Sequence, residues 1–365
     1  MYANTTTSNN TAIGYKALED NTAADNTAVG KDALKNNTTG SSNTAVGSDS
    51  LEANTTASYG TAVGYQALNV NTTGASNSAF GARALDANTT GDYNTALGGW
   101  ALSANTTANN NTAVGYHSLL ANTTTSSNTA IGYNALTANT AAENTAVGVS
   151  ALEDNTTGTR NTAMGVDALQ ECTTGDDNTA FGYNALENPT TASDNTAVGS
   201  YALTSNTTGE RNTGVGKGAL QSTTTGSQNT AIGYAALNTN STGSHNTAVG
   251  ENALSFSTTA DNNTAVGDEA LEANTTGASN TAVGRQALEA NTTGTNNTAV
   301  GYQGLRANTT GQDNVSMGVN ALTANTTGNY NTAIGRDCLE ENTTADNNTA
   351  MGYKALSLNL SLIHI

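Results

Sequence analysis

The feature that most limits what this chain can fold into is a repeat of 17 residues that runs through almost its whole length. The unit reads Asn-Thr-Ala-(Val/Ile)-Gly-x-x-Ala-Leu-x-x-Asn-Thr-Thr-Gly-x-x, and it begins at Asn10 and recurs until Asn348. Self-similarity at a fixed period predicts a stack of like units, each of which contacts only its neighbours. We number the positions of this unit from 1, at the first Asn, to 17.

The repeat sets the expected domain organisation. Of the 20 complete units, the two that begin at Asn10 and Asn128 lack one residue, and the gap falls after the second Asn, which predicts a surface loop there. We expect residues 1–359 to form one continuous array that is open at both ends. Residues 360–365 break the pattern and resemble the translated end of a transposase-type sequencing adapter, so we expect them to be a library artefact.

The 21 copies allow positions to be compared within one chain. Position 5 is always Gly and position 9 always Leu, position 4 is always a large apolar residue, and positions 3 and 8 are almost always Ala. The Asn, large apolar, Gly and Leu columns are therefore the candidate structural positions. In the first three units they are Asn10, Ile13, Gly14, Leu18, Asn26, Val29, Gly30, Leu34, Asn43, Val46, Gly47 and Leu51.

Positions 1 to 5 predict a short strand, because β-branched residues favour a pleated backbone and the Gly ends it. Alternation places the Thr and Val columns on one face of the strand and the Ala column on the other. Val315, which replaces Thr, indicates that position 2 is at least half-buried. The segment x-x-Ala-Leu-x-x-Asn fits either a single helical or 3-10 turn or a second bent strand, with Leu turned inward.

A period of 17 is too short for a helical hairpin and too long for a heptad, but it suits one coil of a β-solenoid. We therefore predict an all-β, β-roll-like solenoid of about 20 coils with 17 residues per coil. A rise of about 4.8 Å per coil would make a rod on the order of 100 Å long. Positions 6, 7, 10, 11, 16 and 17 carry most charges and tyrosines, so we expect them to face solvent.

Stacked coils place like side chains above one another, and an amide has both a donor and an acceptor with which to bond its copies. We therefore expect Asn ladders at positions 1 and 12. Position 12 also holds Cys172, Pro189, Thr223 and Ser257, so we expect the ladder at position 1 to matter more. One coil buries too little to fold alone, and the flat Ala columns would let neighbouring chains approach closely. We expect self-association, as a homotrimer or as a filament that grows at its uncapped coil edges.

Several functions find no support in the residues. A net charge of -18 argues against a nucleic-acid partner, and no run of 18 apolar residues suggests insertion into a membrane. The two cysteines and three histidines form no metal motif, and acidic pairs such as Asp176-Asp177 lack the calcium-binding nonapeptide. We expect no cofactor. We also expect no enzymatic activity, because a polysaccharide-cleaving β-helix would need an acidic pair that breaks the repeat.

The segment Ala-Val-Gly-x-x-Ala with a later Thr-Thr-Gly, as in residues 26–30 and 38–40, resembles the head repeat of trimeric autotransporter adhesins. It is also similar to repeats of bacterial and phage tail-fibre-type proteins. The likeness recurs over residues 1–359, although this unit is three residues longer than the adhesin repeat. The resemblance implies a left-handed, mostly trimeric β-roll in a surface-exposed stalk or adhesive head, with an extracellular or cell-surface location and no catalytic residue.

The expected function is therefore that of a non-enzymatic structural protein, a segment of an extracellular fibre or adhesin stalk. The Thr columns at positions 13 and 14 offer an alternative, an ice- or glycan-surface-binding solenoid. Those hydroxyls could instead bond neighbouring coils or carry O-linked sugar. Asn-Thr-Thr is also an N-glycosylation sequon, but an Asn in a buried ladder could not be modified.

Overall fold

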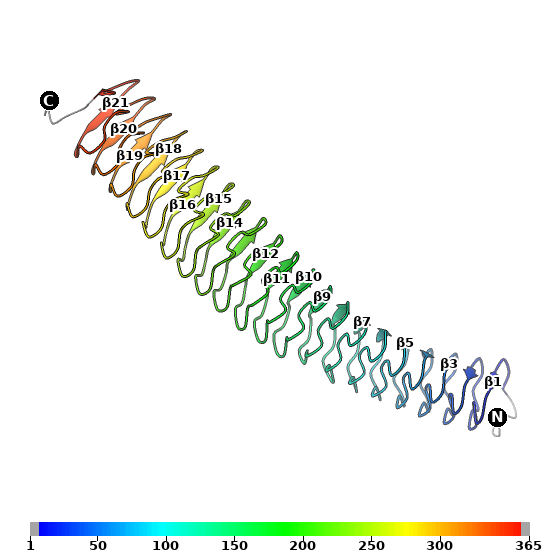
Figure 1. The fold of residues 1–365 in the computed structure, drawn as a ribbon. Coiled ribbons are helices and arrows are strands. Elements are labelled where there is room, and N and C mark those ends of the chain that lie inside the picture. Colours follow the sequence, from blue (N-terminus) through cyan, green and yellow to red (C-terminus); the bar gives the residue numbers. More distant parts are fainter. Residues whose placement is uncertain (1–6, 359–365) are drawn as a thin grey trace. The chain divides into compact units, whose positions relative to one another are not determined.

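The computed structural model describes residues 7–358, which form two compact units, residues 7–178 and residues 179–358. Each unit is a parallel β-solenoid in which every coil contributes one three-residue strand (Figure 1). The expectation that residues 360–365 are an artefact concerns residues outside the described range.

The strands of the two units have the following bounds. The first unit contains β1 (Thr11–Ile13), β2 (Thr27–Val29), β3 (Thr44–Val46), β4 (Thr61–Val63), β5 (Ser78–Phe80), β6 (Thr95–Leu97), β7 (Thr112–Val114), β8 (Thr129–Ile131), β9 (Thr145–Val147) and β10 (Thr162–Met164). The second unit contains β11 (Thr179–Phe181), β12 (Thr196–Val198), β13 (Thr213–Val215), β14 (Thr230–Ile232), β15 (Thr247–Val249), β16 (Thr264–Val266), β17 (Thr281–Val283), β18 (Thr298–Val300), β19 (Val315–Met317), β20 (Thr332–Ile334) and β21 (Thr349–Met351).

Within each unit, successive strands pair in parallel and in register. In β2 and β3, for example, Thr27 lies opposite Thr44 and Val29 opposite Val46. The coil that begins at Asn128 has one residue fewer but keeps this register, since Thr129 lies opposite Thr145. The missing residue therefore falls outside the strand. The predicted all-β solenoid with 17 residues per coil is therefore confirmed.

The segment after the Gly is neither of the two predicted alternatives, because in residues 7–358 it forms successive turns and no helix or second strand. Asn71 donates its backbone N–H to the Leu68 carbonyl at 3.2 Å, which closes a turn within the coil. Leu68 donates its own N–H to the Ala84 carbonyl of the next coil at 3.0 Å. The turns are thus bonded sideways to the adjacent coil, which replaces the hydrogen bonds that a helix would have made within itself.

These turns require left-handed backbone at three positions. The Leu at position 9 has φ between 48° and 55° in every coil, and positions 7 and 17 are also left-handed. Such a conformation costs roughly 1–2 kcal/mol for a residue with a Cβ and is worse for a β-branched one. This explains why position 9 is Leu and never Ile or Val, and why positions 7 and 17 hold no β-branched residue in any coil.

The interior of each coil is thin and consists of the Ala columns and the Leu column. Ala28, Ala33 and Leu34 are fully buried. At position 3 even a methyl group is tightly held, because a Cβ added to Gly214 would lie 3.2 Å from the Ala219 carbonyl oxygen and 3.4 Å from Leu203 Cγ. The prediction that the flat Ala columns let neighbouring chains approach closely was wrong, because these columns are buried inside the coil, where there is room only for small side chains.

The Gly column lets successive coils approach through their backbones. Gly47 has φ 136°, and a Cβ at this position would lie 2.4 Å from the Gly64 carbonyl oxygen. Any side chain would therefore separate the coils, which accounts for the invariance of position 5.

Both Asn columns are buried and form ladders, but by different bonds. At position 12, Asn54 Nδ2 donates to Asn37 Oδ1 at 2.7 Å, so this column is a direct amide ladder. At position 1, the Asn43 backbone N–H donates to Asn26 Oδ1 at 3.0 Å, while Asn43 Nδ2 donates to the Ala57 carbonyl at 2.9 Å. In the first unit the amide-to-amide bonds thus run through position 12, the column that the sequence led us to rank second.

Candidate interaction surface

The outer face of each sheet carries positions 2 and 4, and neither position holds a charged residue in any coil. We call the position 4 residues the outer apolar column. In the first unit they are Ile13, Val29, Val46, Val63, Phe80, Leu97, Val114, Ile131, Val147 and Met164. In the second unit they are Phe181, Val198, Val215, Ile232, Val249, Val266, Val283, Val300, Met317, Ile334 and Met351.

The outer apolar column is substantially exposed to solvent. Phe80 is 40% exposed and Leu97 49% in the first unit, and Phe181 is 51% exposed in the second. Val315, at position 2, is half-buried as expected. A contiguous row of large apolar side chains on the surface is typical of a site that binds another protein or surface.

Position 6 borders this column and adds aromatic rings to it. Tyr15, Tyr65 and Tyr116 are exposed, as the sequence led us to expect. The Tyr116 ring stacks on that of Tyr133 in the next coil, with centroids 6.0 Å apart. The Tyr side chains therefore extend the apolar surface at one edge of the strands.

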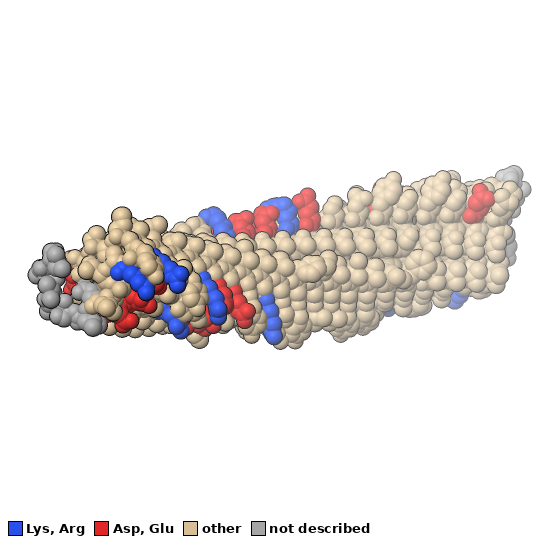
Figure 2. Space-filling model, turned by 90° about the horizontal axis from the view of Figure 1, so that it is seen from above, with Lys and Arg blue, Asp and Glu red and all other residues tan. Residues whose placement is uncertain are grey.

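Charged side chains lie outside positions 2 and 4, some of them at the bordering position 6. Figure 2 shows Lys and Arg beside Asp and Glu in mixed groups, with wide areas that carry no charged side chain. Arg285 Nε lies 3.1 Å from Asp268 Oδ2, and Arg306 Nε lies 2.6 Å from Glu289 Oε2, in each case one coil away. These ion pairs link successive coils and leave the outer sheet face uncharged.

The Thr columns divide into a structural one and an exposed one. At position 13, Thr55 Oγ1 donates to the Thr72 carbonyl of the next coil at 3.1 Å, and this bond recurs along both units. At position 14 the described Thr side chains are exposed, as in Thr56 and Thr276. The Asn of the Asn-Thr-Thr sequon, such as Asn54, is fully buried and therefore inaccessible to a glycosylating enzyme.

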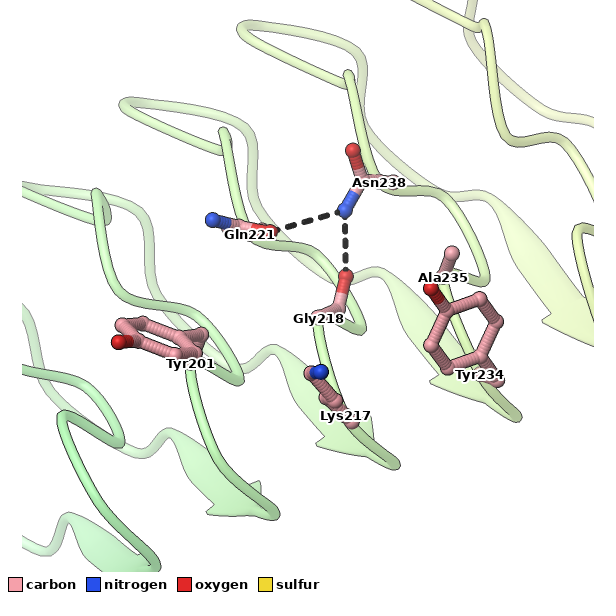
Figure 3. Close-up of a pocket in the computed structure, with 7 residues that line it drawn as sticks. All are labelled: Tyr201, Lys217, Gly218, Gln221, Tyr234, Ala235 and Asn238. Atoms are coloured by element: carbon pink, nitrogen blue, oxygen red, sulfur yellow. Dashed lines mark hydrogen bonds between the residues drawn. The ribbon is translucent and has the colours of Figure 1, made fainter.

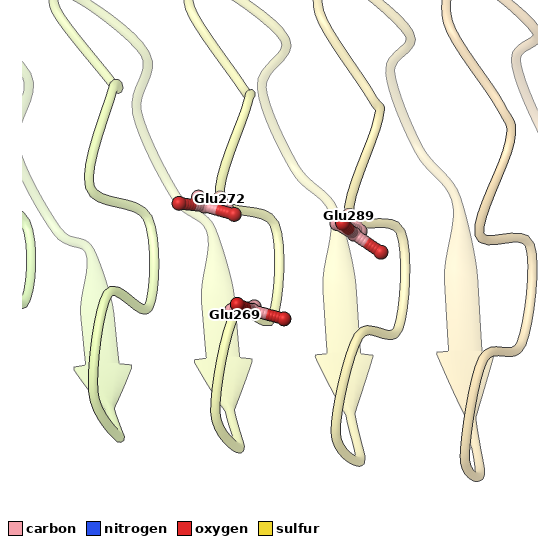
Figure 4. A group of neighbouring side chains, drawn as sticks. All are labelled: Glu269, Glu272 and Glu289. Atoms are coloured by element: carbon pink, nitrogen blue, oxygen red, sulfur yellow. The ribbon is translucent and has the colours of Figure 1, made fainter.

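One acidic group occurs in the second unit, where carboxylate oxygens of Glu269, Glu272 and Glu289 lie within 4.8 Å of one another (Figure 4). Two of the three are engaged by neighbours. Gln286 Nε2 donates to Glu269 at 2.7 Å, and Glu289 pairs with Arg306. Partial burial, with the nearby Glu269 charge, raises the pKa of Glu272. The group therefore gives no support for a metal site.

The cysteines are unsuited to nucleophilic chemistry. Both are buried free thiols, and burial raises the pKa of Cys172 to about 11 and also raises that of Cys338. A thiol with a raised pKa carries little of the reactive thiolate at neutral pH.

The range of residues found at each position indicates which face of the strand is outside, whereas alternation along the strand does not. Position 4 accepts Val, Ile, Phe, Leu and Met, whereas positions 3 and 8 accept almost only Ala. A close-packed interior does not tolerate such a range of volumes, so the variable apolar column had to be the outer one.

Within residues 7–358, no helix has the length and apolar character that crossing a bilayer requires. Comparison with protein-family models and with curated proteins finds no match to this chain.

Proposed function

We propose that the chain is a non-enzymatic structural protein, a segment of an extracellular or cell-surface fibre whose copies associate side by side through the outer apolar column. The observation that carries this proposal is the uncharged row of half-exposed, large apolar side chains, which advances by one residue per coil in each unit. The likeness of the repeat to trimeric autotransporter adhesin heads and tail-fibre-type proteins supports the same conclusion.

A second copy of the chain is the partner that fits this face best. An identical chain has the same spacing between coils, so every coil can meet a like coil without a loss of register. Covering the row removes apolar surface from water at about 25 cal/mol per Å². The net charge of -18 repels contact through the remaining faces and so favours the uncharged one. A trimer or a laterally joined filament satisfies this geometry.

The charged residues support a structural and not a catalytic role. The acidic group of Glu269, Glu272 and Glu289 is the one place in the described residues where three possible metal-binding carboxylates, cysteines or histidines converge, and neighbours already engage two of them. A hydrolase would need a carboxylic acid and a carboxylate poised toward an open site.

The oligomeric state tests this proposal. The double variant Val266→Lys, Val283→Lys places two like charges on the outer face in successive coils. The control, Thr276→Lys, Thr293→Lys, places the same charges at exposed position 14. We expect light scattering after size-exclusion chromatography to show an oligomer for the wild type and the control, and a monomer for the outer-face variant. A monomeric wild type at all concentrations, or equal dissociation of both variants, would contradict the proposal.

The exposed Thr row at position 14 favours a second candidate, an ice- or glycan-surface-binding role. Its hydroxyls repeat once per coil on an exposed edge, while those at position 13 are used between coils. A thermal hysteresis assay that shows no ice shaping by the wild type would dispose of the ice function. If ice shaping occurs, Thr276→Lys, Thr293→Lys is expected to weaken it.

A further inference from the structure

One place in the second unit departs from the repeat and opens a groove. Position 7 usually holds a larger side chain, but Gly218 and Ala235 occupy it in two successive coils. Together with neighbouring residues they line a depression with an empty volume of about 250 Å³, including its open mouth. Its lining residues are Tyr201, Lys217, Gly218, Gln221, Tyr234, Ala235 and Asn238.

Two tyrosines flank this groove. Figure 3 shows Tyr201 on one side of Gly218 and Tyr234 on the other, in coils that precede and follow the coil of Gly218. Tyr201 is held by an edge-to-face contact with Tyr183, whose ring centroid lies 5.3 Å away. The rings come from positions two coils apart, roughly 10 Å along the stack. Gly218, which has no side chain, lies in the coil between them.

The groove also holds an unpartnered cation. All eleven Lys and Arg residues lie within residues 7–358, and eight of them form ion pairs with acids. Arg83 and Lys354 lie over aromatic rings, which leaves Lys217 alone without either kind of partner in this part of the chain. Although the net charge of the chain is -18, this exposed lysine has no acidic partner, so its ammonium group can attract an anionic group of a ligand.

A side-chain amide completes the polar surroundings. Asn238 Nδ2 donates to the Gly218 carbonyl at 2.8 Å and to Gln221 Oε1 at 3.2 Å. The bond to Gln221 Oε1 orients that amide so that its Nε2 points away from Asn238, on the side of Tyr201 (Figure 3). The amide nitrogen of Gln221 therefore remains available as a donor to a hydroxyl or a carboxylate.

We propose that this groove binds one carboxylate-bearing sugar residue of an acidic polysaccharide, with the carboxylate on Lys217 and the sugar ring between Tyr201 and Tyr234. A pyranose has apolar C–H faces that pack on aromatic rings and hydroxyls that bond to amides, which is what the groove offers. One lysine matches one carboxylate. Ligands with denser charge, such as polyphosphates, would need several cations where the groove has one.

Saturation-transfer NMR with methyl glucuronide as the probe tests the proposal, with methyl glucoside as the neutral control and a Glu-containing peptide as the alternative acid. Low salt is required because the lysine is exposed and its attraction is screened. A single lysine and two flanking rings predict a dissociation constant on the order of 1 mM. We expect methyl glucuronide to bind at least tenfold more tightly than methyl glucoside.

Two variants locate the binding and one controls for charge. Lys217→Gln removes the cation and is expected to weaken glucuronide binding at least tenfold. Gly218→Gln fills the groove on a backbone that already accepts Gln at this position, since Gln66, Gln286 and Gln303 have φ 56°. Arg285→Gln removes a cation at the equivalent position of another coil, where Asp268 pairs with it, and is expected to leave binding unchanged.

The proposal is overturned by any of three results: equal binding of the charged and neutral sugars, unchanged glucuronide binding in both Lys217→Gln and Gly218→Gln, or binding of the peptide alone. Thermal melts of each variant that match the wild type show that a loss of binding is not a loss of fold. Lys217 and Tyr234 lie at position 6, which borders the outer apolar column, so binding is measured for the wild type and for the outer-face variant Val266→Lys, Val283→Lys. Equal binding by the two proteins separates this site from self-association.

Discussion

The inner and outer faces of the same three-residue strands obey different rules. Inside, Ala28 and Ala45 are fully buried, and the chain permits almost no other residue at their position. Outside, the neighbouring position accepts five different large apolar residues, among them Phe80 and Met164. The strict face is filled by the smallest side chains, and the tolerant face carries the largest.

This difference shows what makes a position of the repeat invariant. The restriction comes from the backbone conformation and from the space inside a coil, and not from the size of the apolar side chain. Leu at position 9 is invariant because it must fill the interior from a left-handed backbone. Gly at position 5 is invariant because the next coil's carbonyl occupies the space of a Cβ. The outer column varies because its side chains project into solvent, where the volume is not restricted.

The largest expected effect comes from the inner face. Leu85→Ala removes a fully buried side chain and should lower the free energy of unfolding by about 2–5 kcal/mol. Phe80→Ala, on the outer face of the same coil, should cost about 1 kcal/mol or less, because Phe80 is 40% exposed. Urea unfolding of both variants measures the difference. Equal losses would contradict the assignment of the two faces.

The second prediction separates backbone conformation from burial. Leu85→Ile conserves volume but places a β-branched residue at φ 53°, so we expect a loss of about 1–3 kcal/mol. The matched control is Val114→Ile on the outer face, where Ile13 and Ile131 already occur, and it should be neutral. Thermal unfolding of both variants decides the point, and a neutral Leu85→Ile would show that the left-handed backbone does not restrict this position.

The third prediction concerns the buried amide ladder at position 12. Asn240 Oδ1 and Ser257 Oγ lack hydrogen-bond partners among the described residues. Ser257 occupies position 12, where most coils have the Asn whose amide would bond to Asn240. Ser257→Asn should restore the ladder and stabilise the second unit by about 1 kcal/mol. The reverse variant, Asn308→Ser, should lower the free energy of unfolding by a similar amount. It removes the hydrogen bond that Asn325 Nδ2 donates to Asn308 Oδ1 at 3.0 Å. Shifts of the same sign in the two urea midpoints would contradict this account.

The smallest effect is electrostatic. The pKa of Glu272 is raised in the folded protein, chiefly by partial burial, so the fold favours its protonated form. Its ionisation therefore lowers stability as the pH rises past the ordinary glutamate value, and the penalty is absent at lower pH. Glu272→Gln should stabilise the protein slightly at pH 7, by well under about 1 kcal/mol given solvent screening, and not at pH 3. Melting curves of the wild type and the variant at both pH values test the sign of this change in stability.

Much of the fold could be predicted because the chain carries many copies of each position. The 17-residue coil, the strand at Thr-Ala-Val, the inward Leu and the Asn ladders all follow from spacing and stacking. Alternation along a strand also gave the two faces correctly, but it does not say which of them is inside. That choice depended on the width of the coil, which no single unit reveals.

The turns and the groove were harder to predict for different reasons. The left-handed positions leave only an indirect trace in the sequence, the absence of Val, Ile and Thr from positions 7, 9 and 17. The groove depends on three coils at once, since Tyr201, Gly218 and Tyr234 come together only when the coils stack. Within its own unit, Gly218 is simply a small residue in a variable column.

The most direct test of the central claim is a cryo-electron microscopy map of the purified assembly that resolves side chains. The account predicts the Leu and Ala columns inside each coil and the outer apolar column, with residues such as Val266 and Val283, at the contact between chains. A map with Ala265 and Ala282 at that contact, and the position 4 side chains packed inside the coils, would contradict it.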